Sequence, residues 1–473
     1  MSIPLGRASA REPGATLASL LRGVIIVTCL AGSLLAASPA TAASRPLRTA
    51  IVDPGAYAAA DPAPAFALTK STGARFVRLS MSWARVAPTE PDPMSDPTDP
   101  ANAAYTWTDF DLQVEQAKAA GLEPIVCIET APSWAGGLHP DPVKFGAFAE
   151  AAARRYSDAA VPPVGKPRVR YWQAWNEPNR DYFLMPQYEN GQVVSAAHYR
   201  SMVNQFAAGV RDANPTNRVI AGGLAPLGRT GKPAPLSFMK KVLEASVSFD
   251  IWAHHPYTSG GPLHRSAGKG DVTLGNLGEM RTLLMSKDSK INNDTALQFW
   301  VTEFSWDSKP PDPDALGQPL HRRWVAEALY RMWSAGVSLV TWFRLEDDPL
   351  TGPLGTPYQS GFYTTSGSPK ASLQAFRFPT VALTKRGGIL VWGRTPGTTA
   401  TSVTIQIKTG RTWKKLSTLN SNGQGIFTKT YKVPYRKGYI RAKASGQFSV
   451  PFSLTYVRDR FVNPFGCGGG IAC

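Results

Sequence analysis

Short apolar runs rich in β-branched and aromatic residues alternate with segments of helical periodicity from residue 48 to about residue 380. This alternation is typical of parallel strands joined by crossover helices. We expect eight strands, which are Arg48–Val52, Arg75–Ser80, Glu123–Ile128, Val169–Trp175, Arg218–Gly223, Phe249–His254, Phe299–Thr302 and Ser338–Phe343.

Three of the intervening segments carry apolar residues at positions i, i+3, i+4 and i+7, which predicts helices with one face on the strands. Asp141, followed by a proline, predicts a helix N-cap, Ser195 predicts the cap of the next helix, and Gly336 marks a helix end. The three apolar stripes are Phe145/Phe148/Ala149/Ala152, Tyr199/Met202/Val203/Phe206 and Val325/Ala328/Leu329/Met332.

The number of units distinguishes two α/β architectures. A doubly wound open sheet usually has fewer units and a glycine-rich phosphate turn after its first strand, whereas residues 52–55 read Val-Asp-Pro-Gly. The sequence therefore predicts a (β/α)₈ barrel, the TIM barrel, over residues 46–380.

The pattern changes after residue 380. Val403, Ile405 and Ile407 alternate with polar residues, a turn is predicted at Asn422, and no helical stripe is found. We expect a small all-β, sandwich-like domain over residues 381–457, followed by a glycine-rich tail over 458–473.

The N-terminus has the pattern of an export signal. Three arginines precede an apolar run over residues 23–37, and small residues follow up to Ala43. The alternative is a membrane anchor, but this run is shorter than the roughly 20 residues of a spanning helix. We expect residues 1–43 to be removed, with no transmembrane anchor afterwards, so that the protein is secreted and extracellular, with association to the cell envelope as a further expectation.

The four cysteines fit an exported protein. Cys29 would leave with the signal, and Cys467 and Cys473 predict a disulfide in the tail. Cys127 lies in an apolar run and is either a small buried side chain or a reactive thiol. Because there is no Cys-x-x-Cys pair or histidine cluster, we expect neither a metal nor a cofactor.

The net charge of +17 is concentrated near the C-terminus, where residues 381–473 hold 15 Lys and Arg but one acid, Asp459. With an export signal, such a charge favours an anionic cell-envelope polymer or acidic polysaccharide as partner over nucleic acid. The alternative is a solvated basic surface.

Two glutamates follow predicted strands at the barrel end where active sites lie. Glu177 follows the fourth strand and Glu303 follows the seventh. Two carboxyl groups facing one another are what glycoside hydrolysis requires, one as a proton donor and one as an ionised nucleophile. The alternative is that Asn-Glu-Pro is a turn and that Glu303 is an ion-pair partner.

The sequence Trp-Asn-Glu-Pro-Asn at residues 175–179 and the glutamate after Trp-Val-Thr at residues 300–302 resemble clan A of the retaining glycoside hydrolases, with families 39 and 5 the most similar. The resemblance covers about 330 residues and excludes the C-terminal domain. It implies that Glu177 is the acid/base and Glu303 the nucleophile, and that Asn176 binds the sugar 2-hydroxyl.

Four further residues match the clan in order along the barrel. The resemblance implies that Arg78 lies beneath the nucleophile, that Tyr257 orients it, that His255 lies near the sugar, and that Trp342 forms the floor of the innermost subsite. For Arg78, His255 and Trp342 the alternatives are a structural ion pair, a core histidine and core packing. Loop aromatics either stack on sugars or cap cores, and they are Trp134, Tyr182, Phe183 and Trp306.

We therefore expect a secreted retaining glycoside hydrolase that cleaves O-glycosidic bonds of a polysaccharide or oligosaccharide by double displacement. A transglycosylase would share these residues, and a non-catalytic carbohydrate-binding envelope protein is the alternative from another class. Sugar, linkage, and exo or endo action are left open by the sequence.

Overall fold

The computed structural model describes residues 45–158, 166–293, 295–353, 357–435 and 437–455. The predicted export signal, the glycine-rich tail, and Cys29, Cys467 and Cys473 lie outside the described residues. Within the described residues, no helix combines the length and apolar character needed to cross a membrane.

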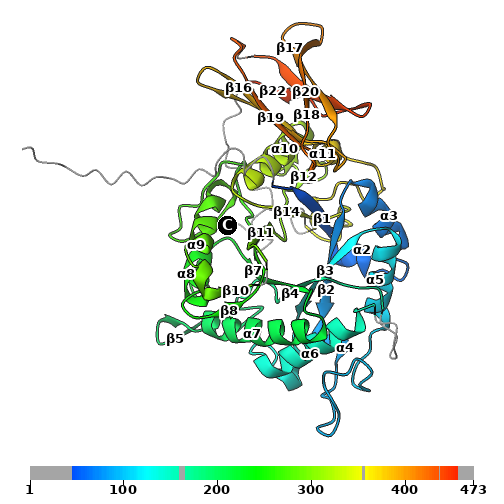
Figure 1. Ribbon diagram of the computed structural model, residues 1–473, viewed down its shortest axis with the longest axis vertical. Coiled ribbons are helices and arrows are strands. Elements are labelled where there is room, and N and C mark those ends of the chain that lie inside the picture. Colours follow the sequence, from blue (N-terminus) through cyan, green and yellow to red (C-terminus); the bar gives the residue numbers. More distant parts are fainter. Residues whose placement is uncertain (1–44, 159–165, 294, 354–356, 436, 456–473) are drawn as a thin grey trace, which may run out of the picture. The chain divides into compact units, whose positions relative to one another are not determined.

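The central element is a closed barrel of eight parallel strands (Figure 1). The strands follow the order β1-β14-β11-β9-β7-β4-β3-β2, and β1 closes the ring by pairing with both β14 and β2. All eight predicted strands are confirmed, with ends that differ by two residues or fewer from the expected ones. They are β1 (Arg48–Val52), β2 (Phe76–Ser82), β3 (Glu123–Glu129), β4 (Tyr171–Ala174), β7 (Arg218–Leu224), β9 (Ile251–His254), β11 (Gln298–Val301) and β14 (Leu339–Phe343).

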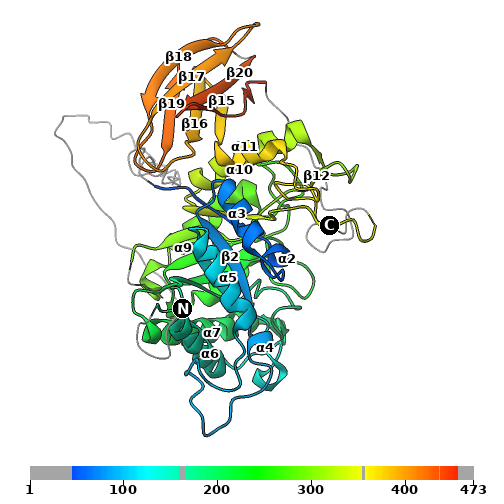
Figure 2. The ribbon, with the colours of Figure 1, turned by 90° about the vertical axis from the view of Figure 1, so that its right-hand side faces the viewer.

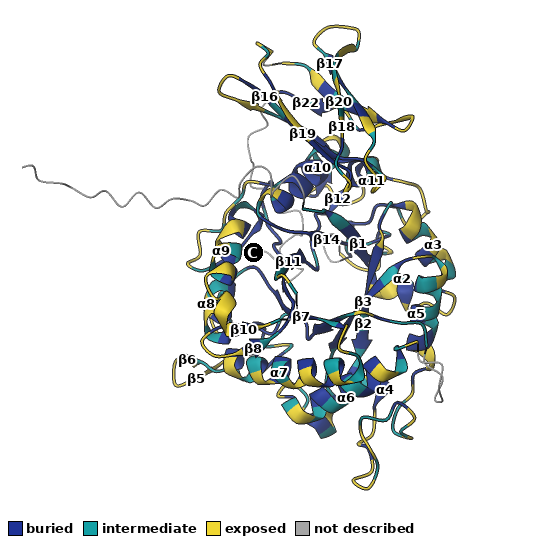
Figure 3. Cartoon of the chain, in the orientation of Figure 1, coloured by how far each residue is buried: buried dark blue, intermediate teal, exposed yellow. Residues whose placement is uncertain are grey.

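Helices surround the ring of strands and bury one face against it (Figures 1 and 3). The three apolar stripes predicted from the sequence are confirmed as buried faces of α6, α7 and α10. The α-helices are α2 (Pro54–Tyr57), α3 (Ala63–Ser71), α4 (Trp83–Val86), α5 (Thr108–Ala119), α6 (Pro142–Arg155), α7 (Ser195–Ala213), α8 (Pro235–Val242), α9 (Leu277–Met285), α10 (Gln318–Ser334) and α11 (Ala371–Arg377).

Two of the three predicted helix ends are confirmed. The Asp141 carboxylate accepts hydrogen bonds from the amides of Val143 and Lys144, as an N-cap does. Gly336 follows α10 with φ +103°, a conformation that favours glycine. The prediction for Ser195 is wrong, because Val194 is the N-cap of α7 and the Ser195 hydroxyl instead donates to the Gln187 side chain.

Alternate residues of each strand point into the barrel, and the interior is apolar near the N-terminal ends of the strands. Phe76, Tyr171 and Trp300 contact one another there, with ring centroids 5.3–6.3 Å apart. Cys127 is buried, and burial raises the pKa of its thiol. The small-buried-residue interpretation of Cys127 is therefore the one that the structure supports. Polar residues occupy the inward positions nearer the C-terminal strand ends.

The C-terminal strands form two antiparallel sheets (Figure 2). Trp392 of β16 packs on Tyr330 and Trp333 of α10, with ring centroids 5.4 Å apart in both pairs, so the sheets share an apolar contact with the barrel. One sheet contains β15 (Thr380–Lys385), β16 (Gly388–Arg394) and β19 (Ile426–Tyr431); the other contains β17 (Ser402–Lys408), β18 (Lys414–Asn420), β20 (Tyr439–Ala444), β21 (Gln447–Phe448) and β22 (Phe452–Ser453).

Candidate active site

Glu177 and Glu303 both follow the C-terminal ends of barrel strands. Glu177 comes three residues after β4, and Glu303 comes two residues after β11. Trp175 and Glu177 have φ values of +67° and +37°, a region that non-glycine residues adopt rarely. Such backbone strain persists only where the surrounding structure imposes it, and it is frequent at functional sites.

Arg78 connects three inward-facing side chains beneath this mouth. Its guanidinium donates to Glu303 Oε1 at 2.8 Å, to Asn176 Oδ1 at 2.9 Å and to Gln173 Oε1 at 3.1 Å. The side chain is 2% exposed. Burial opposes its charge, but the acidic groups of Cys127, Glu303 and Glu129 outweigh burial and raise the pKa of Arg78. A guanidinium that is held by three partners fixes the position of the Glu303 carboxylate.

His255 lies between the two glutamates. Its Nδ1 is 3.0 Å from Glu177 Oε1 and 3.8 Å from Glu303 Oε2, while its Nε2 is 3.1 Å from the Thr302 hydroxyl. The imidazole is fully buried. The carboxylates of Glu177 and Glu303 therefore both lie within 4 Å of the same atom, Nδ1 of His255.

A tyrosine donates to each glutamate. The Tyr257 hydroxyl donates to Glu303 Oε2 at 3.2 Å, and the Tyr182 hydroxyl donates to Glu177 Oε2 at 3.3 Å. Burial and then the neighbouring carboxylate raise the pKa of both phenols, so they stay protonated donors. Both carboxylates remain accessible, since the Glu177 and Glu303 side chains are 13% and 15% exposed.

Six of the seven predicted site residues are thus brought together, and Trp342 is not among them. Trp342 is 1% exposed, its ring stacks on Phe362 and contacts Phe376, and its indole N–H donates to the Ser360 carbonyl. Its position in β14 points out of the barrel, toward α10. The structure therefore places Trp342 in the core, as the packing alternative expects, and not among the other predicted site residues.

Phe343, the next residue, points the other way and is partly exposed. Its ring contacts Tyr358 edge to face at 5.1 Å. The pKa of Tyr358 is raised to about 12 by burial and then by Glu303, Asp307 and Glu177, which places this phenol within electrostatic reach of both carboxylates. The alternation of inward and outward residues along β14 is the signal that would have selected Phe343.

The sequence interpretation also left Gln173, Thr302 and Glu129 without roles. Each occupies an inward position at or near the end of its strand, which is the signal that could have identified them. Burial raises the pKa of the Glu129 carboxyl, Arg78 opposes that rise and Glu303 adds to it. Glu129 is therefore a third carboxyl group in the same electrostatic network.

The loop aromatics divide by position. Trp306 is fully buried and its indole donates to backbone carbonyls, so it packs in the core. Trp134 is partly buried against Trp83. Tyr182 is half-exposed, and its hydroxyl donates to Glu177. Across the described residues, no group of three or more His, Cys, Asp and Glu side chains has the arrangement of a metal site.

No protein-family model and no curated protein matches this sequence. Among solved structures, a family 39 glycoside hydrolase from the gut symbiont Bacteroides cellulosilyticus WH2 has a TM-score of 0.54 and 17% identity, over 82% of both chains. A glucosidase from Croceicoccus marinus has a TM-score of 0.45 and 15% identity, over 78% of this chain and 89% of that one. A GH5_18 protein from Bifidobacterium longum subsp. longum has a TM-score of 0.48 and 12% identity, over 70% of this chain and 77% of that one. The neighbours are glycoside hydrolases, and the first of them shows that this chain has their (β/α)₈ barrel fold.

Proposed function

We propose that this protein is a retaining glycoside hydrolase in which Glu303 is the nucleophile and Glu177 the acid/base. One observation carries the proposal: two accessible carboxylates at the C-terminal ends of β4 and β11 both approach Nδ1 of His255, within 3.0 and 3.8 Å. Active sites of (β/α)₈ barrels lie at this end, and paired carboxyl groups are the machinery of glycoside hydrolysis.

The environments of the two glutamates support different roles. Each Glu303 oxygen accepts one hydrogen bond, Oε1 from the Arg78 guanidinium and Oε2 from the Tyr257 hydroxyl, so the carboxylate is held in a fixed orientation. Glu177 accepts from Tyr182 and lies beside His255. In the first step a Glu303 oxygen bonds to the anomeric carbon while the glycosidic bond breaks and Glu177 transfers its proton to the departing oxygen. In the second step Glu177 takes a proton from water, the water oxygen bonds to the anomeric carbon, and the Glu303 ester breaks.

The spacing of the carboxylates supports retention of configuration. Glu177 Oε1 and Glu303 Oε2 both lie within 4 Å of His255 Nδ1, so these two oxygens are separated by at most about 7 Å. The two carboxyl groups are ~5.5 Å apart in retaining enzymes and ~6.5–9.5 Å apart in inverting ones. The limit of about 7 Å therefore admits the retaining separation and excludes most of the inverting range.

A hollow beside Tyr257 offers room for further parts of a carbohydrate. It encloses about 420 Å³ and is lined by Arg229, His264 and Asp271 among others. The substrate is therefore expected to extend from the cleaved glycosidic bond toward this hollow. Loss of the Arg229 side chain should weaken the binding of long substrates more than the binding of short ones.

The test compares three variants on a panel of aryl glycosides and polysaccharides. Glu303→Gln should lower kcat/KM by at least about 10³-fold, whereas the control Glu244→Gln, at an exposed glutamate that follows α8, should keep full activity. Glu177→Gln with added azide should release a glycosyl azide of retained configuration, because azide needs no base to attack the glycosyl-enzyme.

Substantial turnover by Glu303→Gln, or a first product of inverted configuration by NMR, would contradict the assignment. Products lengthened by an added sugar acceptor would instead identify a transglycosylase that uses the same intermediate.

Export is a separate proposal that rests on the sequence of residues 1–43. The mature protein recovered from culture medium should begin after Ala42 or Ala43, as N-terminal sequencing would show. Recovery of the full-length chain in the membrane fraction would support an anchor instead.

A further inference from the structure

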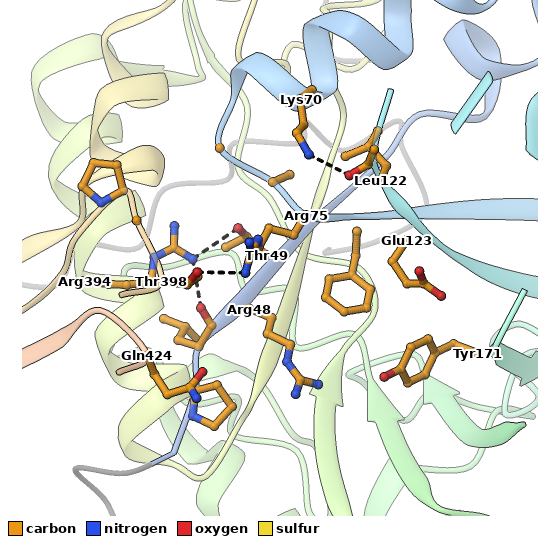
Figure 4. Close-up of a pocket in the computed structure, with 18 of the residues that line it drawn as sticks. Arg48, Thr49, Lys70, Arg75, Leu122, Glu123, Tyr171, Arg394, Thr398 and Gln424 are labelled. Atoms are coloured by element: carbon orange, nitrogen blue, oxygen red, sulfur yellow. Dashed lines mark hydrogen bonds between the residues drawn. The ribbon is translucent and has the colours of Figure 1, made fainter. Parts of the chain in front are cut away.

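Figure 4 shows a large pocket at the N-terminal ends of barrel strands, whereas Glu177 and Glu303 follow the C-terminal ends of β4 and β11. It encloses about 1220 Å³ between the N-terminal ends of β1 to β4 and the segment that follows β16. Residues from both structural parts therefore line it. Arg48 and Tyr171 come from the barrel, Arg394 ends β16, and Thr398 and Gln424 lie in loops of the C-terminal domain.

The lining of this pocket is strongly cationic. Seven Lys and Arg side chains face one carboxylate, that of Glu123, which already pairs with Lys118 at 3.0 Å. Within the described ranges the other six cations, Arg48, Lys70, Arg75, Arg168, Arg170 and Arg394, have no ion pair. A concave site lined by one sign of charge concentrates the field and attracts ions of the opposite sign.

Several of these cations are held in place by neutral groups. Arg394 is 7% exposed, and its guanidinium donates to the Leu47 carbonyl, the Thr49 hydroxyl and the Phe376 carbonyl. Burial lowers the pKa of Arg394 only to about 10, so it stays charged at neutral pH. Lys70 donates to the Gly121 carbonyl at 2.6 Å. Neutral acceptors position these charges without cancelling them.

Arg75 joins the two structural parts across the pocket, since its guanidinium donates to the Thr398 hydroxyl at 3.0 Å (Figure 4). Two aromatic rings lie among the cations: the Arg48 guanidinium is 5.9 Å from the Phe76 centroid, and that of Arg170 is 6.0 Å from the Tyr171 centroid. Tyr171 is the partly exposed one of the two rings, and a ring beside a guanidinium group suits a sugar ring that carries an anionic substituent.

We propose that this pocket binds a segment of an anionic polysaccharide and so holds the protein on an acidic glycan while the opposite end of the barrel stays open. The volume exceeds what a single phosphate or sulfate needs and accommodates several sugar units.

Most cations of this pocket belong to the barrel and not to the basic C-terminal domain that the sequence suggested as the binding surface. The excess charge of residues 381–473 predicts binding by the C-terminal domain, yet six of the seven pocket cations precede residue 381 and only Arg394 belongs to the β-sheets. The inference is independent of the roles of Glu177 and Glu303.

The experiment compares two variants of equal charge in the full chain. Arg75→Glu/Arg170→Glu alters exposed pocket residues, and Lys414→Glu/Lys415→Glu alters exposed lysines of β18 outside the pocket. Calorimetry at low and moderate salt would measure binding to polygalacturonate and to dextran sulfate, which distinguish carboxylate from sulfate recognition, with neutral dextran as blank. Cleavage of a short aryl glycoside monitors folding of the catalytic end.

The expected result is that the pocket variant weakens Kd for at least one polyanion by about tenfold or more, because two cations are lost and two repulsive charges are added. The β18 variant should stay within about twofold of the parent, and both should keep the parent's melting temperature. Three outcomes would overturn the proposal: an equal loss in both variants, no binding of either polyanion by the parent chain, or tighter binding of single-stranded RNA than of both glycans.

Discussion

The two aromatic residues that end β14 have opposite surroundings, and this predicts opposite effects of mutation. Trp342 is buried among aromatic rings, so Trp342→Leu should lower the free energy of unfolding by about 3 kcal/mol or more. Phe343 is partly exposed, so Phe343→Ala should keep most of the stability and raise KM. Chemical denaturation and steady-state kinetics would separate the two. A raised KM for a folded Trp342→Leu, with none for Phe343→Ala, would restore Trp342 as the sugar-binding residue.

Tyr257 is the residue whose removal should test how Glu303 is positioned. Tyr257→Phe deletes the hydroxyl that donates to Glu303 Oε2 and leaves the ring packed on Phe304. We expect kcat to fall by about 10- to 100-fold, since one charge-assisted hydrogen bond to a reacting group is lost. Tyr188→Phe, on an exposed hairpin, is the control. Equal kinetics for the two variants would remove Tyr257 from the site.

The sequence predicted those site residues that stand in a motif or at the end of a predicted strand. Glu177, Asn176 and Glu303 stand in recognisable motifs, and Arg78 is buried within a strand where an arginine needs partners. Trp342 was misplaced because its inward or outward direction depends on the alternation along β14. Glu129 carries no motif, and only the fold shows that its carboxyl approaches Arg78.

Two glycines permit the close approach of α6 and α7. A Cβ at Gly209 would lie 2.4 Å from the Gly146 carbonyl oxygen, and a Cβ at Gly146 would lie 2.8 Å from that of Gln205. Alanine normally favours a helix over glycine by about 1 kcal/mol, but here Gly209→Ala should destabilise by about 1–3 kcal/mol through overpacking. In α9, Gly278→Ala meets nothing within 4 Å and should stabilise. Thermal unfolding of both variants checks the contrast, and stabilisation by Gly209→Ala would refute the contact.

Periodicity found the long elements and missed the short ones. All eight strands and the buried stripes of α6, α7 and α10 follow from apolar spacing, because each element buries one face. The two-residue strands have too few positions to show a period. These are β21 and β22 of the C-terminal domain and the pairs β5 (Tyr188–Glu189) with β6 (Gln192–Val193), β8 (Val247–Ser248) with β10 (Ile291–Asn292), and β12 (Ser308–Lys309) with β13 (Leu316–Gly317).

The two ends of the barrel gather different charged groups. Carboxylates gather at the C-terminal strand ends, and unpaired cations gather around the N-terminal ends. The sequence could not show the second group, because its members are scattered from Arg48 to Arg394 and form no local cluster. Only closure of the barrel and docking of the β-sheets bring them together.

Buried histidines should make the whole molecule sensitive to acid. His254 and His321 are fully buried, and burial lowers the pKa of each imidazole to about 3. Below an unfolded-state pKa of about 6.5, the unfolded chain binds protons that the folded chain does not bind, so each histidine removes about 1.4 kcal/mol of stability per pH unit until about pH 3.

The variant His254→Gln tests this argument, because glutamine does not titrate. It keeps a donor for the Val272 carbonyl, which His254 Nε2 approaches at 2.8 Å. Denaturation at pH 7 and pH 5 should therefore show a smaller loss of stability in this variant than in the parent, with the loss from carboxylates common to both. Equal losses would mean that His254 binds protons alike in the folded and unfolded chain.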